Sequence, residues 1–265
     1  MKDNEIESKK YELVGDGYEK SGVLLRRIRA KRDIPAHGVK NGDLGGWVQG
    51  EANLSQYGDC WVADTAVVFG KAVVKGDAVV KGRARVYGEA TVCGEATVCG
   101  CATVWCSATV AGCAIVKDQA EVAGSATVGE DGDCVQCVVE DCAKVMHDAF
   151  VYGGAVVGGF AVVGGSAQLD GARIGGVSCV LDGLLKDDSP LVSVSPVSIA
   201  GRSGSLTANR QTGSVAYREG GTVRSFNSPG LFAAECIAQD GVAGFLDGGA
   251  AAALRALEVM LNGKD

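Results

Sequence analysis

The sequence predicts an all-β solenoid, in which short strands stack as successive coils around one narrow core. Twelve valines stand at a strict spacing of six residues from Val62 to Val128, and an alanine lies four residues after each of the first eleven. Glycine lies two residues after the valine in eight of the twelve units. A short fixed period of this kind is typical of solenoids, because each repeat buries its apolar side chains only by stacking on its neighbours.

Each repeat, written V-x-G-x-A-x, describes one straight edge and one corner of a coil. We expect the valine and the alanine to point inward, whereas glycine or aspartate at the third position suits a corner with a positive φ. Three edges make a triangular coil of about eighteen residues, and neighbouring coils lie ~4.8 Å apart. Residues one coil apart in the sequence therefore stack as columns along the solenoid.

The first two parts of the chain are a cap and the solenoid itself. Residues 1–47 lie outside the repeat and are expected to form an N-terminal β-hairpin cap over the first coil. Its strands are predicted at Tyr11–Val14 and Val23–Arg29, around a turn segment that opens with Gly15-Asp16-Gly17. Residues 48–181 form the predicted solenoid, in which the repeat is interrupted between Gly129 and Cys137 and then resumes one residue out of phase.

A second, smaller unit follows the repeat. Residues 182–198, with two prolines and an acidic pair, are predicted to be a linker. Residues 199–265 are predicted to form a small α+β C-terminal domain. It has a β-hairpin over 214–226 and helices over 229–239 and 250–261.

Composition excludes several classes of protein. The net charge of −7 does not favour nucleic acid as a partner. No run of ~18 apolar residues is present, so we expect no membrane span. The charged segment after Met1 is unlike a secretion signal, and eleven cysteines without such a signal indicate thiols in a reducing, cytoplasmic setting.

The unit V-x-G-x-A-x resembles the hexapeptide repeat of left-handed β-helix proteins over roughly residues 48–175. The segments Gly42–Val48, Asn53–Gln56 and Gly58–Val62 are similar to a bacterial and prophage-borne subgroup whose members are often labelled polymer-forming proteins or transferases. The resemblance implies a left-handed parallel β-helix and a homo-oligomer, with a trimer expected by analogy. The resemblance implies a fold but not a function, because the subgroup has no settled activity.

Two surfaces are candidates for association. One coil apart, Phe69, Tyr87 and Trp105 form an outward aromatic column, which is either a binding stripe or oligomer seam, or a ladder that stabilises the face. Between Val151 and Gly176 the outward side carries glycine pairs with Val156 and Val162. A flat apolar patch of this kind favours association, and drift of a low-complexity repeat is the alternative.

His147 is the candidate general base if the protein is an enzyme. Many hexapeptide-repeat proteins are acyl-CoA transferases, which the resemblance extends to this chain with acetyl-CoA as the cofactor and a histidine that deprotonates the acceptor. His147 occupies a corner and is the one histidine within the repeat. We see no long acceptor-binding loop, and a lone surface histidine is more often without a catalytic role.

A zinc site is a weaker hypothesis at the same place. Cys134, Cys137, Cys142 and His147 have the spacing of a zinc knuckle, with the last two ligand types exchanged. However, Cys142 and His147 fall at or beside successive corners, which an edge of about five residues separates by ~16 Å. We therefore favour ordinary buried or surface cysteines and expect no metal.

A basic cluster lies on and after the second strand of the predicted hairpin. Five of the seven residues from Arg26 to Arg32 are basic, a density that permits contact with nucleic acid. The favoured interpretation is a solvated strand edge whose charges block pairing with another chain.

The function predicted from these observations is a non-enzymatic scaffold that acts in self-assembly or in binding a protein or small ligand. A narrower version is a phage-borne inhibitor or sequestering protein. The alternative is a hexapeptide-repeat acyl-CoA transferase that uses His147 as its base. Binding of acetyl-CoA would separate the enzyme from the scaffold.

Overall fold

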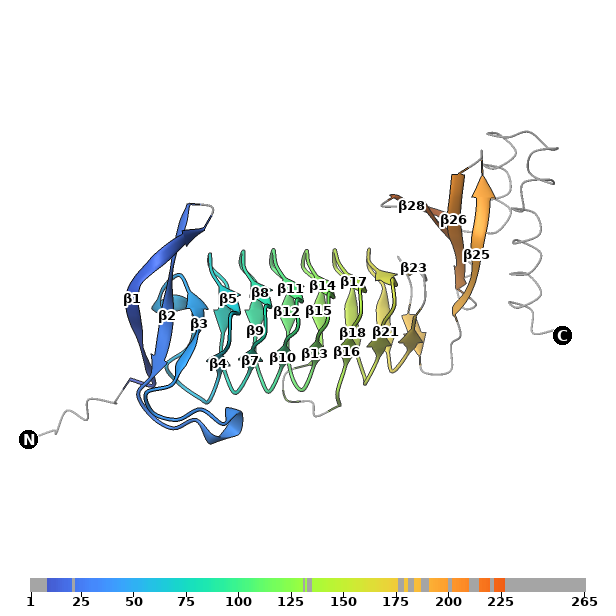
Figure 1. Ribbon diagram of the computed structural model, residues 1–265. Helices are drawn as coiled ribbons and strands as arrows, with labels where there is room; N and C mark the ends of the chain where they lie inside the picture. The colour runs from blue at the N-terminus through green and yellow to red at the C-terminus, as the bar shows by residue number, and fades with distance from the viewer. Residues whose placement is uncertain are drawn as a thin grey trace, which may run out of the picture.

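The computed structural model describes residues 9–20, 22–130, 132, 135–175, 179–180, 184–186, 191–199, 202–209, 215–219 and 222–226. These residues form a β-solenoid with three parallel sheets, preceded by an antiparallel hairpin (Figure 1). The predicted all-β solenoid is thus confirmed, and the left-handed sense of the coil stays a prediction. No helix in the described part of the chain is long and apolar enough to cross a membrane.

The first sheet has ten strands and includes the hairpin. In spatial order its strands are β1 (Tyr11–Lys20), β2 (Val23–Ala30), β3 (Leu44–Val48), β5 (Val67–Val68), β8 (Arg85–Val86), β11 (Thr103–Val104), β14 (Glu121–Val122), β17 (Lys144–Val145), β20 (Val162–Val163) and β23 (Cys179–Val180).

The other two solenoid sheets have seven strands each. One contains β4 (Trp61–Val62), β7 (Val79–Val80), β10 (Thr97–Val98), β13 (Ile115–Val116), β16 (Val138–Val139), β19 (Val156–Val157) and β22 (Arg173–Ile174). The other contains β6 (Val73–Val74), β9 (Thr91–Val92), β12 (Thr109–Val110), β15 (Thr127–Val128), β18 (Phe150–Tyr152), β21 (Gln168–Asp170) and β24 (Leu184–Lys186).

Valine and alanine make up most of the solenoid core, as predicted, with Leu54, Cys60, Cys137, Leu169 and Ile174 at the remaining core positions. Val98, Val104 and Ala102 are fully buried. Thr103 of β11 pairs with Arg85 on one side and Glu121 on the other, which is the eighteen-residue register that the period predicts. Most strands of the coils are only two residues long because the corner that follows takes a positive φ, for example at Gly88, Gly100 and Gly124.

The interruption between Gly129 and Cys137 lengthens one coil and leaves the stacking intact. Across the interruption, the corner residues Asp118 and Asp141 are in contact and lie 23 positions apart in the sequence. In the next coil, the corresponding residues Asp141 and Gly159 lie 18 positions apart. Ile115 pairs with Val138 and Val116 with Val139, so the column of valines continues. The extra residues therefore leave the register of the strands on either side unchanged.

Two boundaries differ from the prediction. β1 continues through Gly15–Gly17 to Lys20, because these residues form a bulge with positive φ and not a turn. The solenoid continues past residue 181, since β24 pairs in parallel with β21.

The predicted linker is also wrong in part, because residues 191–199 form strand β25 (Leu191–Ile199). This strand pairs with β26 (Arg202–Asn209) in a four-stranded antiparallel sheet. The alternation of Val192, Val194 and Val197 with serines suits a strand. The predicted hairpin is confirmed as β27 (Val215–Glu219) and β28 (Thr222–Phe226). The helices expected over 229–239 and 250–261 lie outside the described residues.

Candidate functional site

The predicted aromatic column is present on the outer surface of the ten-stranded sheet. The rings of Phe69 and Tyr87 stack with centroids 5.0 Å apart, and those of Tyr87 and Trp105 stack at 6.0 Å. All three side chains are half-buried. Because the rings face one another, they present their edges to solvent, and the column forms a raised ridge. Such a ladder stabilises the sheet and leaves little ring face for a flat ligand such as a sugar.

A polar network fixes the end of the ridge. Trp105 donates a hydrogen bond from Nε1 to Glu121 Oε1 at 2.8 Å, and Lys144 Nζ lies 2.7 Å from Glu121 Oε2. Burial acts to raise the pKa of Glu121, but hydrogen bonds from Lys144 and Trp105 outweigh it and lower that pKa. Glu121 is therefore held as a carboxylate between the two side chains.

The column beside the ridge extends to the hairpin through Trp47. Trp47 of β3 pairs with Val67 of β5, and its ring meets that of Tyr18 edge-on at 4.6 Å. Arg27 lies 5.4 Å above the same indole and donates to Gly45 O at 2.7 and 2.9 Å. We call the surface defined by Trp47, Phe69, Tyr87, Trp105 and the adjacent column the outer face. That column is Val67, Arg85, Thr103, Glu121, Lys144 and Val162.

The second predicted surface is smaller than expected. Val156 is half-buried, but Val162 exposes only 6% of its surface. The adjacent coils place Lys144 and Cys179 directly beside Val162 in the sheet. In a column of ~4.8 Å spacing, the Lys144 side chain lies close enough to cover part of an apolar neighbour. Val162 therefore adds little apolar surface to the region.

His147 lies exposed at a corner, with a φ of 61°. Its Nδ1 accepts a hydrogen bond from the backbone N–H of Gly165, one coil later, at 3.4 Å. Aspartates at other corners make the same contact: Asp64 Oδ2 accepts from Gly82 N, and Asp141 Oδ2 accepts from Gly159 N, both at 2.8 Å. His147 thus occupies the place of a structural acceptor that bridges two coils.

The predicted zinc ligands do not converge among the described residues. Cys137 is buried in the core, where the two adjacent coils carry Ala114 and Ala155, while Cys142 is half-buried near the surface. Cys134 lies outside the described residues. No group of three or more histidine, cysteine or acidic side chains in the described part of the chain could hold a metal ion.

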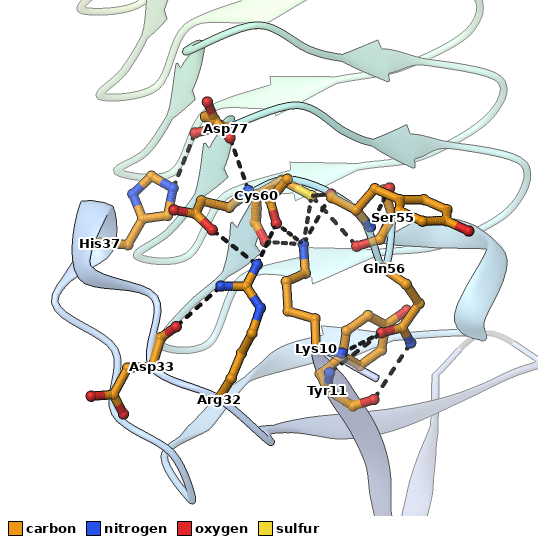
Figure 2. A network of polar contacts seen from close by, with 12 residues as sticks. Lys10, Tyr11, Arg32, Asp33, His37, Ser55, Gln56, Cys60 and Asp77 are labelled. Atoms are coloured by element: carbon orange, nitrogen blue, oxygen red, sulfur yellow. Dashed lines mark hydrogen bonds and ion pairs between the residues drawn. The ribbon is translucent and has the colours of Figure 1, made fainter. Parts of the chain in front are cut away.

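Sequence reasoning missed a polar network under the hairpin, drawn in Figure 2. Lys10, the residue immediately before β1, exposes only 1% of its surface, and its Nζ lies 2.8 Å from Cys60 O and 3.0 Å from Cys60 Sγ. Tyr11 donates its hydroxyl proton to Leu54 O at 2.6 Å. The available signal was Cys60 itself, which replaces an alanine of the repeat just after two inserted residues.

Burial controls the ionisation of this network. It lowers the pKa of Lys10, although the Cys60 thiol acts in the opposite direction. It raises the pKa of Cys60 and of Tyr11 as well. All three groups are therefore displaced toward their neutral forms, and Lys10 is compensated by the carbonyl oxygens around its amine.

Acidic groups pair with part of the basic cluster. Arg32 donates to Asp59 Oδ1 and Gly58 O at 3.0 Å, and Arg29 and Lys31 each lie 3.7 Å from Glu12. His37 Nε2 lies 3.0 Å from Asp77 O, so it joins the hairpin segment to the solenoid. These contacts give the cluster a structural role at the base of the cap.

No protein-family model matches the chain, and a search of curated proteins finds no match either. The fold and the geometry of its faces are therefore the basis for any functional conclusion.

Proposed function

We propose that the protein is a non-catalytic solenoid scaffold that self-associates through the outer face of the ten-stranded sheet. The observation that carries the proposal is the distribution of side-chain size and charge along two adjacent columns of this face. In both columns the side chains before Thr103 and Trp105 differ in size or charge from those after them. Each half is complementary to the opposite half of a second copy.

Size is distributed unevenly along the aromatic column. Phe69 and Tyr87 occupy its N-terminal half, whereas the same column continues beyond Trp105 with Ala123, Met146 and then a glycine. Two copies that pack face to face with antiparallel axes place Tyr87 against Ala123 and Phe69 against Met146 of the other copy. Large side chains then meet small or flexible ones, which is the condition for close packing at an interface.

Charge follows the same order in the adjacent column. Thr103 lies at its centre, with Arg85 one coil before and Glu121 one coil after. The antiparallel arrangement brings the exposed Arg85 opposite Glu121 of the second copy. A two-fold axis along β11 generates both pairs at once, as expected of an isologous interface. Trp105 lies on this axis and is the type of residue that dominates binding energy at interface centres.

The environment of His147 supports a role without catalysis. A general base needs an orienting partner and a reachable acceptor. His147 instead accepts a backbone N–H through Nδ1. The repeats around it, Val139–Ala143, Val145–Ala149 and Val151–Ala155, follow one another without an inserted loop.

The test is sedimentation of charged variants at the proposed axis. Thr103→Glu and Thr103→Lys each place like charges against each other, so either variant alone should be a monomer at ~50 µM, a concentration at which we expect the wild type to be a dimer. An equimolar mixture of the two variants should regain the dimer, because opposite charges then meet. Thr109, which is half-buried at the same repeat position on another sheet, supplies the matched control substitutions.

Three results would refute the proposal. The first is a wild-type protein that sediments as a monomer at this concentration. The second is a pair of Thr103 variants that associate like the wild type, and the third is a mixture that does not recover. A wild-type protein that sediments as a stable trimer, as the family resemblance implies, would also contradict the two-fold arrangement.

A further inference from the structure

The contact between Lys10 and Cys60 is the most chemically unusual one among the described residues. Lys10 Nζ lies 3.0 Å from Cys60 Sγ, and neither residue exposes more than 1% of its surface. The two residues come from separate elements, since Lys10 begins the cap and Cys60 immediately precedes β4. Figure 2 shows the lysine side chain extended toward the thiol, so the contact results from the fold and not from sequence proximity.

The surroundings hold both groups in place. Lys10 Nζ also lies 2.8 Å from Cys60 O and 3.3 Å from Gly58 O. Cys60 Sγ lies 3.6 Å from both Ser55 O and Val74 O. An amine and a sulfur that are fixed in contact react as if each were present at very high local concentration.

Burial favours the form of the amine that can react. It lowers the pKa of Lys10 and so increases the fraction of neutral amine, which has a lone pair available for attack. Burial also raises the pKa of the Cys60 thiol. The first oxidation of sulfur is therefore slow compared with that of an exposed cysteine, because the thiolate is the species that reacts.

We propose that hydrogen peroxide converts this contact into a covalent bond between Cys60 Sγ and Lys10 Nζ. In the first step the sulfur attacks peroxide, the O–O bond breaks, and the products are a sulfenic acid at Cys60 and one water. In the second step the neutral amine attacks that sulfur, the S–O bond breaks, and the oxygen leaves as a second water with one proton from the amine. The sum is thiol, amine and one peroxide giving a sulfenamide and two waters.

The bond would attach the cap to the first coil. It closes a loop between Lys10 and Cys60 and so constrains the unfolded chain, which raises resistance to unfolding. An added thiol reverses it by attacking the sulfur, which releases the lysine amine and leaves a mixed disulfide. A second thiol then restores Cys60. This site on the cap is independent of association through the outer face.

Peptide mapping tests the proposal on the full-length protein. Trypsin places Cys60 in peptide 41–71, which contains no other cysteine, and normally cleaves after Lys10. After incubation with hydrogen peroxide and blocking of remaining thiols, we expect peptide 41–71 joined to peptide 10–20. The joined species should weigh two hydrogens less than the sum of the two peptides, retain its uncleaved Lys10, and disappear on reduction with dithiothreitol.

Three variants define the specificity of the reaction. Cys60→Ser and Lys10→Arg should each abolish the joined species, the second because guanidinium is a poor nucleophile. Cys137→Ala should leave it unchanged, because Cys137 is as buried as Cys60 and the coils on either side carry alanine at that place, Ala114 and Ala155. Far-UV circular dichroism establishes that each variant is folded.

The wild-type map alone is sufficient to overturn the proposal, whatever the variants do. If Cys60 is recovered after peroxide only as thiol, sulfinic acid or sulfonic acid, with Lys10 cleaved normally, the bond does not form. If the joined species instead carries one additional oxygen, the direct sulfur–nitrogen bond is wrong.

Discussion

Substitutions at His147 distinguish a structural corner residue from a catalytic base. The residue has a φ of 61° and provides one acceptor, Nδ1, to the N–H of Gly165. His147→Asp keeps a side-chain acceptor in the arrangement that Asp141 already uses with Gly159. His147→Gly loses the acceptor but removes the cost of the left-handed backbone, and His147→Ala loses the acceptor while keeping that cost.

The magnitudes follow from these two terms. A left-handed conformation costs a residue other than glycine roughly 1–2 kcal/mol, and less for asparagine or aspartate. An exposed hydrogen bond at the long distance of 3.4 Å contributes at most about 0.5 kcal/mol. We therefore expect His147→Gly to stabilise the fold by about 1 kcal/mol. His147→Asp should be neutral or stabilising by up to about 0.5 kcal/mol, and His147→Ala should destabilise by about 0.5 kcal/mol.

Urea denaturation monitored by circular dichroism measures the order of stability of the wild type and the three His147 variants. The same four proteins are then assayed for acetyl transfer from acetyl-CoA to a range of amine and hydroxyl acceptors. We expect no turnover above that of buffer for any of them. The reasoning fails if the wild type transfers acetyl groups and His147→Ala loses the activity while remaining folded. It also fails if His147→Gly is the least stable variant.

Two further predictions concern the core and the cap. Val104→Asp places an unpaired carboxylate at a fully buried position and should lower the free energy of unfolding by several kcal/mol, whereas the same substitution at exposed Lys81 should change it little. A Val104→Asp protein as stable as the wild type would mean that the core is elsewhere. Burial raises the pKa of Tyr11 in the folded protein above the value of ~10 that it has in the unfolded chain. The contribution of the neutral Tyr11 hydroxyl to the free energy of unfolding is therefore complete below pH ~10 and is lost as the pH rises through the folded-state pKa. Denaturation between pH 8 and 11 should therefore show a smaller alkaline loss of stability in Tyr11→Phe, and an unchanged slope would exclude Tyr11 as the source.

The repeat made most of the solenoid predictable. A six-residue period places valine inward, sets the eighteen-residue register and puts Phe69, Tyr87 and Trp105 in one column. Each of these consequences is geometric and requires only that the coils stack. The same reasoning located Cys142 and His147 at or beside successive corners, where backbone geometry separates them.

The cap was predictable only in outline, because its contacts depend on residues far apart in the sequence. Nothing in the local pattern around Lys10 indicates that its amine reaches Cys60. The bulge at Gly15–Gly17 was interpreted as a turn because glycine and aspartate occur in both. The strand over 191–199 was missed because Pro196 suggested a linker, and the register shifts between Val194 and Val197 to accommodate it.

The cap also explains why association is expected at the side of the rod. In a parallel solenoid each coil donates its N–H groups to the next, so the first coil is left with carbonyl groups that have no partner. Side chains supply the missing donors here: Tyr11 to Leu54 O and Lys10 to Cys60 O. Asn53 does the same for Gly70 O and Ala72 O of the second coil, opposite the 3₁₀ turn at Glu51–Asn53. Because these carbonyls are already satisfied, a second solenoid gains little by stacking on this end. The outer face, with its half-exposed ridge and ordered charges, is then the surface that gains most from a second copy.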